Sequence, residues 1–326
     1  MSSIQFECFS DNKKAETQQN FSSITWLKAL ATLLITNSHC TSLWGNYPFL
    51  SFGGLFGNCL FFFISGFCLA YPQKKFLPWI TSRIKRVYWP YVCFIPILIA
   101  SGYVFLSYKY ILFPIEPYHF IPTIIALYPF YYFVTKIKNI KSMVWITISV
   151  VLCQLVYFFF YMGSISVTKH FSVLGLLSYF TMMLMGNFYR RFITPQKHMI
   201  ACLGVIVFFF LYAYQSFNPI NSCLAIFQWY LAWGVVVSLA HLFISFESKL
   251  KRIFFIDLLA THTLEIYIVQ KLLIISLRNL LFPVGIILSF GAILGNAVVL
   301  KKISDFIMEM LCKLITIVRN KNVETD

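Results

Sequence analysis

Charged residues are scarce in this chain of 326 residues. Asp, Glu, Lys and Arg together make up 11% of it, hydrophobic residues make up 59%, and the mean hydropathy is +0.76. A soluble domain of this size cannot bury so much apolar surface, and runs of about 20 apolar residues recur from end to end. The composition therefore excludes a soluble protein and predicts an all-α, polytopic integral membrane protein.

Other common features are missing as well. The nine cysteines form no CxxC pair and most lie inside apolar runs, so we interpret them as packing residues and expect neither disulfides nor a metal site. The sequence has no Gly-rich phosphate loop, internal repeat or low-complexity stretch. Its first two dozen residues are polar, which is the wrong order for a cleaved signal peptide, so the first apolar helix is expected to stay as an uncleaved anchor.

What the chain has in abundance is apolar segments of membrane-crossing length. The segment 119–134 is the shortest and contains Pro122 and Pro129. Apolar runs of this kind predict transmembrane helices. Ten are expected, at 24–43, 52–71, 87–106, 119–134, 142–162, 171–189, 199–215, 223–245, 254–277 and 281–300.

The basic residues alternate between the loops that join these segments. Lys and Arg number 26 against 11 Asp and Glu, and most of them fall in the two tails and in every second loop. The opposite loops hold Lys109, Lys169 and Arg278. Because positive residues collect on the cytoplasmic side, both termini are predicted to be cytoplasmic. The net charge of +15 is therefore a topology signal, and nucleic acid is not expected as a partner.

The chain is predicted to consist of one membrane domain with two short polar ends. Residues 1–23 form a polar cytoplasmic tail, and residues 24–300 form the membrane domain. Residues 301–326 place apolar side chains at helical spacing between charged ones. This pattern predicts an amphipathic cytoplasmic segment, which is either a helix lying along the membrane interface or a simple extension of the tenth helix.

Two ionisable residues lie inside the first apolar segment. Lys28 and His39 are eleven residues apart, so at about 100° per residue they point from one face of a helix, about 16 Å apart along its axis. Ionisable groups at membrane depth are costly, which makes each a candidate functional residue. A packing histidine and a lysine that reaches back to the headgroups are the structural alternatives.

A second group of candidates follows the second apolar segment. Ser65 and Gly66 interrupt a bulky run and would let a neighbouring backbone come close. Arg83 and Arg86 are spaced i, i+3, so on a helix they project from one side. Two guanidinium groups there can bind a phosphate or pyrophosphate, although a basic cluster that only anchors topology is the alternative.

These residues resemble, in order, the motifs of the acyltransferase-3 family of membrane acyltransferases, which typically modify bacterial surface polysaccharides. The family has an arginine followed eleven residues later by a histidine, a Phe-Phe-x-x-Ser-Gly helix, an Arg-x-x-Arg pair, and a late Leu-Glu-Ile-Tyr run that ends in histidine. The matching residues here are Lys28 and His39, Phe61-Phe62 with Ser65-Gly66, Arg83 and Arg86, and Leu264-Glu265-Ile266-Tyr267 with Gln270.

Three positions depart from the family pattern. Lys28 keeps the charge of the usual arginine but loses its planar fork. Thr25 stands where an acidic residue is common, so the expected ion-pair partner is absent. Gln270 replaces the second histidine, and it can form hydrogen bonds but cannot shuttle a proton.

The resemblance implies an O-acetyltransferase of the bacterial inner membrane. It would take an acyl group, with acetyl the simplest expectation, from cytoplasmic acetyl-CoA and deliver it to a hydroxyl of a surface glycan or its lipid-linked precursor. Arg83, Arg86, Lys28 and Ser65 would then form the donor site. His39 would act as general base or accept the acyl group transiently.

The ninth predicted segment, 254–277, supplies candidate supporting residues. Glu265 and Tyr267 are a candidate supporting pair, but two residues apart they cannot share a helix face. Glu265 also suits a structural ion pair.

One alternative function stays open. A proton-coupled transporter or flippase would use a buried lysine and histidine too, but the sequence shows no inverted repeat or matched pair of broken helices.

Overall fold

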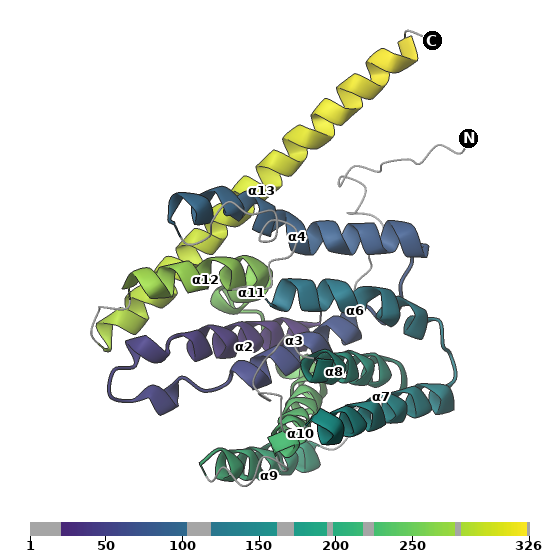
Figure 1. Ribbon diagram of the computed structural model, residues 1–326, viewed down its shortest axis with the longest axis vertical. Coiled ribbons are helices and arrows are strands. Elements are labelled where there is room, and N and C mark those ends of the chain that lie inside the picture. The colour runs from purple at the N-terminus through teal and green to yellow at the C-terminus, as the bar shows by residue number, and fades with distance from the viewer. Residues whose placement is uncertain are drawn as a thin grey trace.

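Helices account for all the regular secondary structure that the computed structural model describes, in residues 21–102, 119–161, 173–193, 198–217, 225–277 and 282–324. The all-α expectation is therefore confirmed for these residues, and a helix overlaps each of the ten predicted segments (Figure 1). The helices are α2 (Ser22–His39), α3 (Gly54–Cys68), α4 (Phe76–Ala100), α6 (Phe120–Thr135), α7 (Ile140–Tyr161), α8 (Val173–Phe192), α9 (His198–Phe217), α10 (Ala225–Ser245), α11 (Phe254–Thr261), α12 (Thr263–Leu277) and α13 (Val284–Glu324).

Helix length limits how many of these elements qualify as membrane spans. Within the described residues, four segments are long and apolar enough to cross a bilayer: Pro48–Cys68, Ile140–Phe160, Ile226–Ser245 and Val284–Leu314. The pair α11 and α12 adds a fifth if it is counted as one bent span. Helices α6 and α12 have 16 and 15 residues, fewer than the roughly 20 that span a hydrocarbon core. Ten spans and cytoplasmic termini therefore stay predictions.

Helix α2 lies at the centre of the contacts that matter for the site. It packs against α3 on one side and against α11 and α12 on the other, and α3 in turn packs against α8 (Figure 1). Helix α4 covers α6, α12 and α13, while α9 pairs with α10. Most of the buried core residues come from the faces of these helices.

Glycine brings α3 and α8 into direct backbone contact. A Cβ atom added to Gly66 would overlap the carbonyl oxygen of Met183, and one added to Gly186 would overlap the carbonyl oxygen of Phe63. Small residues at crossing points let membrane helices approach closely and gain packing energy. The close approach predicted from Gly66 is confirmed, and α8 is the neighbour whose backbone fills the space.

Several basic loops meet at one end of the bundle. The guanidinium of Arg190 lies 4.5 Å from the ring centre of Phe21 and 5.1 Å from that of Phe67. Arg191 donates a hydrogen bond of 2.6 Å from Nη1 to the carbonyl of Ile137. These contacts place the start of α2 and the ends of α3, α6 and α8 together, as the alternating charge pattern predicts for loops on the same side of a membrane.

The amino end of α2 is capped by a residue far away in the sequence. The carboxylate of Glu247 accepts hydrogen bonds from the backbone N–H groups of Ser22 (2.6 Å) and Ser23 (2.9 Å). Glu247→Ala leaves both donors without this partner, so we expect the free energy of unfolding to fall by about 1–2 kcal/mol in detergent-based denaturation. Glu309→Ala removes an exposed pair with Lys313 and serves as the control, with no measurable change expected. Equal effects of the two variants would contradict the capping role.

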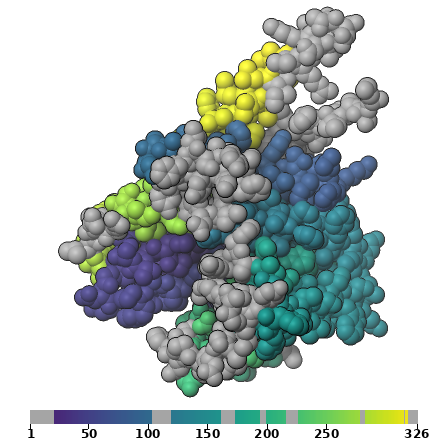
Figure 2. Space-filling model, viewed as in Figure 1, coloured from purple at the N-terminus to yellow at the C-terminus, as the bar shows by residue number. Residues whose placement is uncertain are grey.

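Helix α13 runs without a break from the membrane domain into the predicted C-terminal segment. It has 41 residues, and its C-terminal half projects beyond the rest of the described chain (Figure 2). Of the two alternatives for residues 301–326, the extension of the tenth helix is the one observed as far as residue 324. Exposed apolar side chains follow this extension: Ile303, Phe306, Met310, Leu311, Leu314 and Ile317.

Candidate functional site

Helices α2 and α12 meet along a line of polar side chains within the apolar interior. The hydroxyl of Thr32 donates to that of Thr263 over 3.0 Å, and the hydroxyl of Thr36 donates to Oε1 of Gln270 over 2.8 Å. We call these four residues the polar seam. Buried polar groups are normally hydrogen-bonded, and here each helix supplies the partners of the other.

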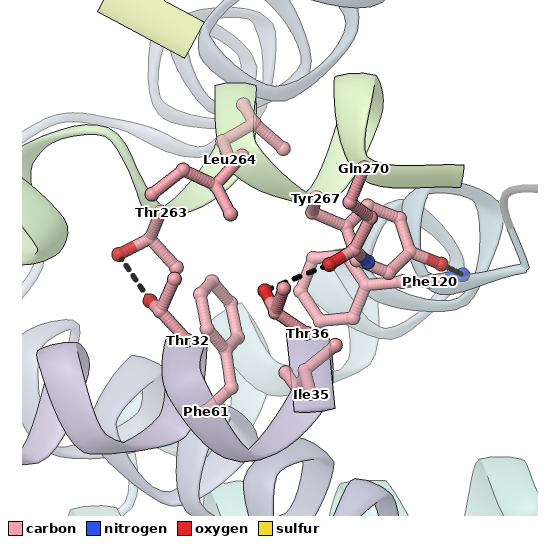
Figure 3. Close-up of a pocket in the computed structure, with 10 residues that line it drawn as sticks. Thr32, Ile35, Thr36, Phe61, Phe120, Thr263, Leu264, Tyr267 and Gln270 are labelled. Atoms are coloured by element: carbon pink, nitrogen blue, oxygen red, sulfur yellow. Dashed lines mark hydrogen bonds between the residues drawn. The ribbon is translucent and has the colours of Figure 1, made fainter. Parts of the chain in front are cut away.

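A cavity opens beside the polar seam. It is small, with room for about one water molecule, and it is formed by side chains from α2, α3, α6 and α12 (Figure 3). Apart from the polar seam, the lining is apolar or aromatic: Ile35, Phe61, Phe120, Leu264, Ile266 and Tyr267. Apolar walls with a few hydrogen-bonding groups are the lining chemistry of small-molecule sites, and a ligand larger than a water molecule has to displace the side chains that form this cavity.

Three aromatic side chains contribute to the lining of the cavity. The ring of Phe120 lies 4.6 Å from that of Phe61 in an edge-on arrangement and 5.2 Å from that of Tyr267. The Tyr267 hydroxyl accepts a hydrogen bond of 3.3 Å from the backbone N–H of Phe120. These contacts fix the start of α6 against the middle of α12. Tyr267, which was expected to support the chemistry, is one of the residues that line the cavity.

A bend in the chain places Thr263 at the cavity. Helices α11 and α12 form an angle of 79°, with His262 at the break and its Nδ1 hydrogen-bonded to the carbonyl of Leu258 over 2.8 Å. Non-helical backbone at membrane depth is tolerated where protein covers it or where it lines a cavity. The bend was not anticipated from the single apolar run 254–277, because no proline or glycine marks it.

Lys28 and His39 lie at the two ends of the seam. Helix α2 is unbroken from Ser22 to His39, so their predicted spacing of eleven residues is kept within one helix. Lys28 is partly buried four residues before Thr32, and His39 is exposed three residues after Thr36. Thr32 and Thr36 therefore occupy the face between them, and the cavity lies beside the stretch that joins the cation to the imidazole.

Ser65 and the arginine pair do not line the cavity. Ser65 is one helical turn beyond Phe61 on α3 and is partly buried. Arg83 and Arg86 lie on α4, the first partly buried and the second exposed, and both act electrostatically on the hydroxyl of Tyr128 on α6. The helix that carries the two arginines begins at Phe76, eleven residues earlier than the predicted apolar segment.

Glu265 faces away from the cavity. Its carboxylate, on a residue only 5% exposed, lies 3.8 Å from the Nζ of Lys301 on α13. Glu265 and Tyr267 thus occupy different faces of α12, as their spacing requires. The contact gives Glu265 a structural partner, and its assignment to catalysis stays a prediction.

The threonines of the polar seam were not anticipated as site residues. Their signal is weak, because Thr32 and Thr36 are small polar residues at i, i+4 on the Lys28–His39 face and nothing in the sequence shows that Thr263 and Gln270 lie opposite. Within the described ranges, no group of three or more His, Cys, Asp or Glu side chains is placed to hold a metal ion. The groups available for chemistry are the imidazole of His39, the ammonium of Lys28 and the neutral hydrogen-bonding groups of the polar seam.

Comparison with known families gives one match. The model of the acyltransferase-3 family, described as an acyltransferase domain, matches residues 21–300. The matched range includes α2, α12 and every lining residue of the cavity. No curated protein and no solved structure shows significant similarity to the chain.

Proposed function

This chain belongs to the acyltransferase-3 family and is a membrane acyltransferase, and from this premise we propose that it is an O-acetyltransferase. The donor is cytoplasmic acetyl-CoA, and the acceptor is a hydroxyl group of a cell-surface glycan or of its lipid-linked precursor. The location that suits this reaction is the bacterial inner membrane, where the donor and the growing glycan are on opposite sides.

One observation carries the proposal: the cavity lies between a fixed cation and an imidazole on the same helix face. A thioester that enters from the Lys28 side passes the polar seam before it reaches His39. Because the two residues are about 16 Å apart along α2, an extended pantetheine arm has the length to cover the distance. The family's chemistry and the geometry of α2 thus point to the same route.

Cationic side chains suit the phosphates of the donor. Arg83 and Arg86 supply guanidinium groups that bind phosphates through paired hydrogen bonds, and Lys28 supplies a point charge. Among the described residues Lys28 forms no ion pair, so its charge is available to an anionic ligand. We place Ser65 in the same donor site because it is one turn beyond the cavity on α3.

His39 carries the chemistry in this proposal. Its imidazole either removes the proton from the attacking sugar hydroxyl or accepts the acetyl group before passing it on. Tyr267 lines the cavity that the thioester enters. We assign Glu265 to holding α12 against α13 through Lys301, which keeps the polar seam in position.

The proposal is tested by acetyl transfer in membranes that carry the full chain. Acetyl-CoA labelled in its acetyl group is supplied on the cytoplasmic side, and label is measured in envelope glycans and in the lipid-linked fraction. Labelled glycan that depends on the protein supports the proposal. Labelled solute that crosses the membrane unchanged, with no labelled glycan, contradicts it in favour of a transporter.

Variants of the arginine pair test the donor site in the same assay. We expect Arg83→Gln together with Arg86→Gln to raise the KM for acetyl-CoA by about ten- to a hundredfold, because a hydrogen bond to a charged group contributes about 1.5–3 kcal/mol. The kcat should change much less. The control is Lys141→Gln, an exposed lysine at the start of α7, a helix that does not line the cavity. Equal KM values for the double variant and the intact protein would remove both arginines from donor binding.

A further inference from the structure

We propose that Gln270 donates a hydrogen bond from Nε2 to the acyl carbonyl oxygen and stabilises the negative charge that forms on it during transfer. This inference rests on the proposed function, since it assigns a donor for the thioester in the same cavity. Gln270 carries no charge and cannot transfer a proton, so the role assigned to it is that of a neutral hydrogen-bond donor.

The amide of Gln270 is oriented by Thr36. The residue is 1% exposed, it lines the cavity, and its Oε1 accepts the Thr36 hydroxyl at 2.8 Å (Figure 3). With the oxygen held by Thr36, the orientation of the amide is set and its two N–H donors point away from that hydroxyl. Among the residues that the structure describes, no hydrogen bond is formed by Nε2.

Nε2 of Gln270 is not one of the fully buried side-chain atoms that lack a partner, so it reaches the space of the cavity, where it is placed to donate to a ligand. The neighbouring walls are apolar and aromatic, and such low-dielectric surroundings strengthen a hydrogen bond made there. The ligand group that the donor requires is an acceptor oxygen. In the proposed reaction, the thioester carbonyl oxygen is the hydrogen-bond acceptor that passes Nε2 of Gln270.

The position along α2 fits the reacting carbon. Thr36, which holds Gln270, is three residues before His39, so the two levels differ by about 4.5 Å along the helix axis. A carbonyl carbon between them has a donor on one side and an imidazole on the other. This is the arrangement that an acyl transfer needs, in which the donor meets charge as it develops.

The step is written with His39 as general base. The sugar hydroxyl oxygen attacks the thioester carbonyl carbon while His39 takes the hydroxyl proton, and the carbonyl electron pair moves onto oxygen, where Nε2 of Gln270 donates to it. The tetrahedral intermediate then re-forms the carbonyl and expels the thiolate of CoA. That thiolate takes the proton from the His39 imidazolium, so the products are acetylated sugar and CoA.

The test compares one chemical change at two buried glutamines. Gln270→Met removes the donor at nearly constant volume, and Gln154→Met makes the same change on α7, where Gln154 is fully buried and bonded to Ser178. We expect Gln270→Met to lower kcat by about 10²- to 10³-fold with KM for acetyl-CoA changed less than about threefold. Gln154→Met should leave kcat within about threefold. Thr36→Val, which frees the amide to rotate, should give a smaller loss than Gln270→Met.

A binding measurement separates this inference from the proposed function. The probes are CoA and a ketone analogue of acetyl-CoA in which a methylene replaces the sulfur. Gln270→Met should weaken binding of the ketone by about three- to tenfold and leave binding of CoA unchanged. An unchanged kcat and unchanged ketone affinity in a folded Gln270→Met protein would overturn the inference while transfer by the intact protein still stands. Intact protein that binds neither probe and transfers no label would overturn the proposed function and the inference with it.

Discussion

Replacing His39 with alanine is expected to reduce acetyl transfer by at least about 10²- to 10⁴-fold, the range that a positioned acid–base group contributes. The reason lies in the geometry of α2, where His39 is the titratable side chain at the far end of the polar seam and Lys28 occupies the near end. No neutral seam residue can take over proton transfer. The measurement is kcat with labelled acetyl-CoA in membranes adjusted to equal protein abundance.

The control for this prediction is a histidine with a structural partner. His241 on α10 shares a hydrogen bond of 2.9 Å with the Tyr189 hydroxyl, and its replacement by alanine should leave kcat within about threefold. Undiminished transfer by His39→Ala would remove His39 from the chemistry. Brief incubation of the intact protein with labelled acetyl-CoA, without acceptor, then separates the two roles: label bound to the protein and released by hydroxylamine indicates an acetylated imidazole, and its absence indicates a general base.

The second large effect is expected at the crossing of α3 and α8. Gly66→Val is expected to prevent normal folding, because even the first carbon of the new side chain overlaps the carbonyl oxygen of Met183 and neither backbone can move without separating the helices. Overpacking of a core costs about 1–3 kcal/mol where side chains can yield, and here a backbone would have to yield. We expect a severe loss of monodisperse protein in detergent, measured by size-exclusion chromatography at equal expression.

Other glycines of the chain supply the matched control. A Cβ atom at Gly291 on α13 would meet nothing within 4 Å, so Gly291→Ala should be neutral or slightly stabilising, since alanine is the better helix former. Gly186→Val, on the other side of the same crossing, should behave like Gly66→Val. A monodisperse Gly66→Val protein with unchanged thermal stability would show that the two backbones do not depend on this contact.

Much of the fold follows from the apolar runs, and the exceptions have physical causes. The segment predicted at 87–106 begins in fact at Phe76, because Trp79 and Ile80 are buried against the bundle although charged residues follow them. Hydropathy averages over both faces of such a helix and so misses an amphipathic start. The bend at His262 cannot be predicted from the sequence for a different reason. The segment contains no helix-breaking residue, and the bend is accompanied by a hydrogen bond between the His262 side chain and the carbonyl of Leu258.

The candidate site was predictable along one helix but not between helices. The common face of Lys28 and His39 follows from helical periodicity, and the contacts of Gly66 follow from residue size. That Thr36 meets Gln270 does not follow, because the two are 234 residues apart in sequence and many faces of α12 are equally apolar. Pairing of distant helices depends on the shapes of complete surfaces, which one sequence does not display.

The short helices around the cavity have a consequence for the membrane itself. At 1.5 Å per residue, α2, α6 and α12 are only about 27, 24 and 22 Å long, against about 30 Å of hydrocarbon in a typical bilayer. A protein with hydrophobic elements shorter than the bilayer thins the lipid around it or lets water approach from both sides. If the protein is the acetyltransferase proposed above, an acetyl group that moves along α2 therefore crosses less than the full thickness of a typical bilayer.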